Sequence, residues 1–304
     1  MSTVGVQTRI SRISLQNILV ATDFSPCSEA AIPYAFGLAK RYGSKVFTVY
    51  VVPHQVFVES AQPDPAQARR TAEWKLAEIA KTEAAQGIKH EEVIREGEVP
   101  EVITKLVRKQ RIDLIVMGTC GRKGVDKLLL GSVAEAIFRV AECPVLTIGP
   151  RVRGPKPDGG LRRILFATDF GPESVEALPF ALSFAEENRA RLTLLHVSPE
   201  PPPLLTEPEA GGMPVVDPGE VVKATESQLR KLIPEGVSLW QEPTFKALFG
   251  PPAETILKIA EQDFDMIVLG VKRPKALTKH LGAGVAYKVV TESPCPVLSV
   301  SSRY

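Results

Sequence analysis

The chain has few of the residues that build metal centres and disulfide frameworks. Its 304 residues include only four cysteines and four histidines. No C-x-x-C pair occurs and no histidine stands at metal-ligand spacing from a cysteine, so neither a zinc site nor a disulfide framework is expected. The histidines lie far apart, and none accompanies a nucleophile signature such as G-x-S-x-G. Each is interpreted as a surface or core histidine rather than a catalyst.

Long apolar runs and an excess of one charge are also missing. No stretch approaches the roughly 18 apolar residues that a membrane span needs. The first sixteen residues lack the apolar core and cleavage site of a secretory signal, so a cytoplasmic protein without membrane contact is expected. The formal net charge is +2. Because Lys and Arg are interspersed with Asp and Glu, nucleic acid is disfavoured as the main partner.

The sequence does contain an internal repeat. Residues 18–24 read ILVATDF, and residues 164–170 read ILFATDF, an offset of 146 (164 minus 18). Further along, DLIVMG at 113–118 returns as DMIVLG at 265–270, where the offset is 152 (265 minus 113). The second copy has therefore gained six residues in between.

Two domains are expected at this length. The boundaries are placed at residues 1–150 and 161–304, joined by a linker at 151–160 that is rich in Pro and Gly. In each copy, β-branched runs alternate with segments of helical period, and the first such helix is expected over residues 26–42. That alternation is typical of an α/β domain, a parallel sheet with helices on both faces.

A glycine-rich loop follows the strand at 113–118. Gly118-Thr-Cys-Gly121 is followed by nine residues and then by Gly131-Ser132 at the start of a helix, a G-x2-G-x9-G-S spacing. Glycines let backbone N–H groups approach an anion, and the N-terminus of a helix favours phosphate. The loop therefore indicates a phosphate site.

Asp23 ends the first strand of the same copy. With the strand order 3-2-1-4-5, strands one and four are neighbours, and a crevice opens at their carboxyl ends. Asp23 and Gly118 then face one ligand. A carboxylate at this place suits hydrogen bonds to ribose hydroxyls, or a Mg²⁺ ion that bridges Asp23 to phosphate oxygens.

Each of these residues also has a purely structural explanation. Gly118 and Gly121 also suit a tight turn, Ser132 suits a helix cap, and Asp23 suits a cap for the helix that follows it. Together on one predicted rim they favour a nucleotide or phosphate ligand. Cys120, inside the loop, has a secondary interpretation as a redox sensor because surrounding N–H groups favour a thiolate.

Three motifs in order resemble the universal stress protein family over nearly the whole chain, twice: ILVATDFS, the glycine loop, and CPVL at 143–146 and again at 295–298. The resemblance implies two tandem doubly wound α/β domains, each a five-stranded parallel sheet in the order 3-2-1-4-5. It also implies an ATP site of the type found in the ATP-binding branch. In that site Asp23 contacts the adenosine, Val51 lines the adenine pocket, and the phosphates are surrounded by Gly118, Gly121, Arg122, Gly131, Ser132 and Val133.

The resemblance further implies that the last strands of the copies meet in an internal pseudo-dimer, and a further homodimer is left open.

The second copy departs from the pattern. It keeps Asp169, Val197 and Gly270, but Arg273 stands where the second glycine belongs, and Ala283-Gly284 replaces Gly131-Ser132. Gly282 lies one residue out of register. One ATP per chain is therefore expected.

The predicted function is that of an ATP-binding regulatory stress-response protein that holds its nucleotide in the first domain. The sequence shows no positioned base or paired carboxylates, so at most slow ATP hydrolysis is expected. One alternative is an adenine-nucleotide-using enzyme of the same fold, for example one that transfers adenylyl groups. Such enzymes carry a Ser-Gly-Gly loop or a His-x-Gly-His signature, and neither occurs here. The other alternative is a scaffold that binds no nucleotide.

Overall fold

The computed structural model of the chain describes residues 13–52, 65–120, 130–154, 160–200, 217–272 and 284–301. By contacts, the chain divides into two compact units. One contains residues 14–160 together with 271–304, and the other is built mainly from residues 161–270. The predicted domain boundaries, 1–150 and 161–304, stay a prediction.

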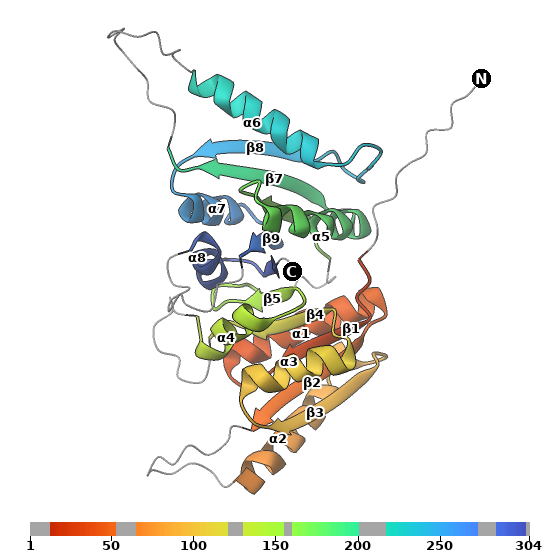
Figure 1. The fold of residues 1–304 in the computed structure, drawn as a ribbon. Coiled ribbons are helices and arrows are strands. Elements are labelled where there is room, and N and C mark those ends of the chain that lie inside the picture. The colour runs from red at the N-terminus through yellow and green to blue at the C-terminus, as the bar shows by residue number, and fades with distance from the viewer. Residues whose placement is uncertain are drawn as a thin grey trace, which may run out of the picture. The chain divides into compact units, whose positions relative to one another are not determined.

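The first repeat forms a five-stranded parallel sheet. Its strands lie in the order β3-β2-β1-β4-β5 (Figure 1). This confirms the order 3-2-1-4-5 and the doubly wound α/β class. The strands other than β3 are almost wholly buried, as expected for parallel strands that are covered on both faces. Their bounds are β1 (Asn17–Ala21), β2 (Lys45–Val52), β3 (His90–Glu96), β4 (Leu114–Gly118) and β5 (Val145–Ile148).

Four α-helices connect these strands: α1 (Pro26–Tyr42), α2 (Pro65–Ala80), α3 (Val99–Gln110) and α4 (Ser132–Val140); a short 3-10 turn, η1 (Glu83–Ala85), precedes β3. Right-handed crossovers place α1 and α2 on one face of the sheet and α3 and α4 on the other. Figure 1 shows α3 beside α4.

Local sequence signals set both ends of α1. The helix begins after Ser25, whose side chain accepts a hydrogen bond from the N–H of Ser28, and Pro26 occupies the first helical position. It ends at Gly43, which has a φ of 68° and donates its N–H to the carbonyl of Ala39. The helix therefore spans residues 26–42, as the sequence predicts.

The second repeat has the same order of elements: β6 (Arg163–Ala167), α5 (Pro172–Asn188), β7 (Arg191–Ser198), α6 (Pro218–Leu232), β8 (Thr244–Phe249), α7 (Pro252–Ala260), β9 (Met266–Val271), α8 (Val285–Glu292) and β10 (Val297–Ser301). The first four strands lie parallel in the order β8-β7-β6-β9. The family pattern is thus present twice.

The last strand of the second repeat lies in the same compact unit as the first repeat. β10 runs antiparallel to β5, with Leu298 opposite Leu146. The hydroxyl of Thr147 donates to the carbonyl of Val297 at 3.1 Å. Leu146 and Leu298 are both fully buried, so β5 is an interior strand of this unit rather than an exposed edge.

None of the helices in the described part of the chain has the length and the apolar character needed to cross a membrane.

His90 begins β3 inside a partly apolar pocket. Its Nε2 atom lies 2.8 Å from the hydroxyl of Thr48, and its ring packs edge-on against Phe36 at 5.2 Å between centroids. Burial lowers the pKa of His90 below its ordinary value of 6.5. The neutral imidazole is therefore the favoured form in the folded chain.

We expect the free energy of unfolding to fall as the pH decreases below about 6.5, the ordinary pKa of histidine. Below that pH His90 binds a proton in the unfolded chain, whereas in the folded chain it stays neutral until the pH reaches its lowered pKa. Protonation therefore favours unfolding. Urea unfolding of the wild type and His90→Gln between pH 7.5 and pH 5 measures the difference. The variant should lose stability less steeply, and two parallel pH profiles would show that His90 is not the group responsible.

Candidate functional site

A strained turn at the carboxyl end of β1 holds Asp23. Phe24 has a φ of 60°, a left-handed conformation that costs an ordinary residue about 1–2 kcal/mol. Two hydrogen bonds support the turn: Phe24 N–H donates to the Thr22 hydroxyl at 3.0 Å, and Ser25 N–H donates to Oδ1 of Asp23, also at 3.0 Å. The Phe24 ring stacks on Tyr50 at 4.9 Å. The carboxylate is thus positioned by its own turn.

Asp23 and Ser132 do not act as helix caps. The N-cap of α1 is Ser25, and the N-cap of α4 is Gly131, which makes Ser132 the first helical residue. The structural explanation that the sequence left open for each side chain is therefore wrong.

Gly118 is required by packing. A Cβ at this position would lie 2.6 Å from the carbonyl carbon and oxygen of Cys27 and 2.8 Å from the nitrogen of Ser28. The end of β4 and the first turn of α1 touch backbone to backbone, and no side chain fits between them. In the second repeat, a Cβ at Gly270 would lie 2.3 Å from the carbonyl carbon of Glu173. This glycine therefore serves the fold in both repeats and does not by itself indicate a phosphate.

The start of α4 presents backbone donors. Gly131 makes no side-chain cap hydrogen bond, and its own N–H donates to the carbonyl of Thr119 at 2.7 Å. Ser132 and Val133 follow in the first turn and are exposed. N–H groups in the first turn of a helix have no intrahelical partner and attract anions, helped by the helix dipole.

A residue of the second repeat also supports this turn. Tyr287, on α8, accepts a hydrogen bond through its hydroxyl oxygen from the N–H of Leu130 at 3.1 Å. Leu130 is buried and directly precedes Gly131. Sequence reasoning missed Tyr287, because no pattern within the first repeat points to it.

These features surround one cavity at the carboxyl ends of β1, β2 and β4. Its empty volume, open mouth included, is about 640 Å³. Its lining includes apolar residues of β2 and α3 and the start of α4. Of the predicted site residues, the structure brings six to this cavity: Asp23, Val51, Gly118, Gly131, Ser132 and Val133. Gly121 and Arg122 lie outside the described residues.

Further apolar residues of the cavity were missed by the sequence. Val49 lies on β2 two residues before Val51, and Val99 and Ile103 come from α3. The alternation of β2 contained a signal for Val49, since residues two apart share one face of a strand. That Val99 and Ile103 of α3 line the cavity can be seen only once the helix is packed on the sheet.

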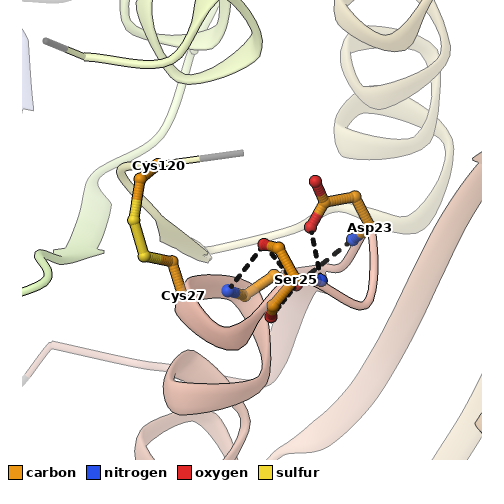
Figure 2. Close-up of a disulfide and its surroundings, with 5 residues drawn as sticks. Asp23, Ser25, Cys27 and Cys120 are labelled. Atoms are coloured by element: carbon orange, nitrogen blue, oxygen red, sulfur yellow. Dashed lines mark hydrogen bonds between the residues drawn. A yellow bond between two sulfur atoms is a disulfide. The ribbon is translucent and has the colours of Figure 1, made fainter. Parts of the chain in front are cut away.

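The sequence suggests no disulfide framework, but one disulfide forms. Cys27, in the first turn of α1, is bonded to Cys120, which follows β4, across 93 residues of sequence (Figure 2). Their Cα atoms lie 5.8 Å apart, inside the usual range for a disulfide. Cys120 also lines the cavity. The pair comes together because Gly118 allows β4 to end against α1.

The rim of the second repeat differs in detail. Oδ1 of Asp169 accepts hydrogen bonds from Gly171 N–H at 2.8 Å and from the Ser174 hydroxyl at 2.7 Å, so this carboxylate is turned back onto α5. Away from the rim, His196 stands at the position of the buried Tyr50. The substitutions that set the second loop apart fall on Arg273, Gly282 and Ala283, outside the described residues.

Within the described part of the chain, no three His, Cys, Asp or Glu residues gather as a metal site would require. The assignment of Mg²⁺ to Asp23 stays a prediction.

The model of the universal stress protein family matches residues 14–149 and again residues 160–301. The chain belongs to the universal stress protein family. It is 34% identical over 147 residues to a universal stress protein of Methanocaldococcus jannaschii, covering 44% of this chain and 81% of that protein. It is 35% identical over 139 residues to universal stress protein A homolog 1 of Coxiella burnetii, covering 44% of this chain and 95% of that protein. A solved universal stress protein from Archaeoglobus fulgidus shares the fold with a TM-score of 0.69 at 24% identity, over 95% of this chain and 99% of that one.

We expect Gly118→Ala to destabilise this universal stress protein by roughly 1–3 kcal/mol, because the added methyl group meets backbone atoms that have no freedom to move aside. Gly37→Ala is the matched control. Gly37 lies inside α1 with nothing within 4 Å of an added Cβ, so alanine there should stabilise by about 0.5–1 kcal/mol. Chemical denaturation of the three proteins measures both effects, and equal stabilities for wild type and Gly118→Ala would refute the packing role.

Proposed function

We propose that the first repeat of this universal stress protein binds ATP, and that the protein acts as a regulatory nucleotide-binding protein. The observation that carries the proposal is the cavity at the carboxyl ends of β1, β2 and β4. It combines an apolar wall, one carboxylate and the open N-terminus of α4. An adenine nucleotide has three matching parts: an apolar base, a ribose with hydroxyl donors, and anionic phosphates.

Each part of the nucleotide has a counterpart in the cavity. The base would lie against Val49 and Val51 of β2 and Ile103 of α3. The ribose hydroxyls would donate to Asp23, whose orientation the Ser25 N–H already restrains. The phosphates would accept hydrogen bonds from the backbone N–H groups that begin α4.

The carboxylate is also compatible with Mg²⁺. That ion commonly takes one or two carboxylates together with substrate phosphate oxygens and water. Asp23 is the one carboxylate among the described residues that line the cavity, so it would hold the ion in the alternative where it does not accept from the ribose. When bound, Mg²⁺ would neutralise phosphate charge, while the N–H groups of α4 orient the phosphates.

Binding is favoured over turnover by the side chains present. The described residues that line the cavity include no Lys, Arg or His, and the carboxylate of Asp23 is assigned to the nucleotide. No group among them is placed as a general base for an attacking water. Slow hydrolysis at most is therefore part of the proposal.

An internal pseudo-dimer of the two repeats is also proposed. It is supported by the antiparallel pairing of β10 with β5 and by the hydrogen bond from Leu130 to Tyr287.

Ser132→Asp should weaken ATP binding at least roughly tenfold, or about 1.4 kcal/mol. A carboxylate in the first turn of α4 stabilises the helix through its dipole but repels phosphate, so the loss should not come from unfolding. Ser132→Asn is the uncharged control and should bind close to wild type. Gly284→Asp places the same charge at the aligned position before α8 and should leave affinity unchanged. Calorimetric titration with ATP and Mg²⁺ compares the four proteins; equal affinities for all would place the phosphates elsewhere.

Titration of nucleotide-free protein should saturate near one ATP per chain. In the second repeat the loop glycine is replaced by Arg273 and the helix-entrance glycine by Ala283, and the Asp169 carboxylate is bonded to Ser174. Ser132→Asp should remove the single equivalent over the same ATP range. Two equivalents of similar affinity would show that the second repeat is a working site. No binding at all would favour the scaffold interpretation.

A further inference from the structure

The disulfide joins the two elements that frame the proposed nucleotide site. Cys27 belongs to the first turn of α1, and Cys120 is the second residue after β4 (Figure 2). Both residues are partly exposed, so small redox reagents can reach them. Cys143 and Cys295 are buried and stand outside this bridge.

The surroundings of Cys27 favour its thiolate when the bridge is open. It is the second residue of α1, where the helix dipole and unpaired N–H groups stabilise negative charge. Cys120 instead lines the cavity beside Gly118 and Gly131. The pair thus combines an activated sulfur outside the cavity with a partner inside it.

We propose that Cys27 and Cys120 form a reversible redox site that controls how tightly the first repeat holds its nucleotide. This inference rests on the proposed nucleotide site. The bridge fixes the backbone of Cys120 next to Thr119, whose carbonyl accepts the hydrogen bond from Gly131 at the start of α4. Bridging therefore restrains the wall of the cavity nearest the phosphates, and restraint before binding lowers the entropy cost of binding. The bridged form is the tighter binder.

The co-reactant is a low-molecular-weight disulfide. The Cys27 thiolate attacks one of its sulfurs, forms a mixed disulfide and releases one small thiolate. The Cys120 thiolate then attacks the Cys27 sulfur, which forms the bridge and releases the second small thiolate. The protein loses two thiol protons and two electrons, and the small disulfide becomes two thiols. Excess small thiol drives the same steps backwards.

The second repeat contains a natural contrast. By the two repeat offsets, Cys27 aligns with Glu173 and Cys120 aligns with Lys272. Neither residue takes part in thiol chemistry. The redox pair therefore occurs only in the repeat that keeps the phosphate-loop glycines, and this coincidence links it to the nucleotide rather than to the fold that both repeats share.

Linkage makes the control reciprocal. If bridging tightens ATP binding by a given factor, saturating ATP must favour the bridge over the dithiol by the same factor. A threefold effect corresponds to a shift of about 14 mV in the midpoint of the dithiol–disulfide couple, toward lower potential. Affinity and redox midpoint are thus two independent measurements of one coupling.

The test uses the full chain in oxidised and reduced glutathione buffers. Peptide mapping by mass spectrometry assigns the bridge, calorimetry measures ATP affinity in each state, and a glutathione titration with and without ATP gives the midpoint. Oxidised protein should bind ATP at least about threefold more tightly. Cys27→Ser, which lies outside the cavity lining, should bind like reduced wild type in both buffers.

The outcomes separate this inference from the nucleotide site itself. Failure of the bridge to form in oxidising buffer overturns the redox site. A bridge that leaves affinity and midpoint unchanged, or that weakens binding, overturns the control while ATP binding stands. Absence of ATP binding in both states overturns the nucleotide site and the control together, even if the bridge forms.

Discussion

The architecture of the site depends on one close approach, that of the first turn of α1 to the end of β4. It requires the absence of a side chain at Gly118, since a Cβ would fall 2.6 Å from the Cys27 carbonyl group. The same requirement at Gly270 shows that both repeats are built on it. Because α1 is held there, the Asp23 turn that precedes it and the residues that follow β4 face one cavity. The disulfide is a second consequence of that contact.

The α/β fold can be predicted from the sequence, because buried parallel strands read as apolar runs and these runs occur in both copies. The bounds of α1 were accessible too, since Pro26 and Gly43 carry their own conformational preferences. The contribution of Ile103, the packing role of Gly118 and the Cys27–Cys120 bridge were not. Each depends on distances between elements that are far apart in sequence, and no spacing rule encodes such distances.

The two repeats share the turn that follows their first strand, but they differ at other positions. The strained turn is kept: Phe170 has a φ of 61° and, like Phe24, donates its N–H to the preceding threonine hydroxyl. Strain of about 1–2 kcal/mol persists only where surrounding structure enforces it. By contrast, the repeats differ at Tyr50 and His196 and at the cysteine pair. The features that the two repeats share are those that connect β1 to α1 and β6 to α5.

The end of the second repeat adds contacts that the first repeat lacks on its own. β10 covers β5, whose backbone groups would otherwise form an unpaired sheet edge. Tyr287 then holds the N–H of Leu130, directly before the N-cap of α4. The helix start proposed to receive the phosphates is therefore fixed at its base by Thr119 within the first repeat and just before it by a side chain from the second. The second repeat, whose own sequence has lost the glycine pattern, thus still constrains the start of α4 in the repeat that keeps it.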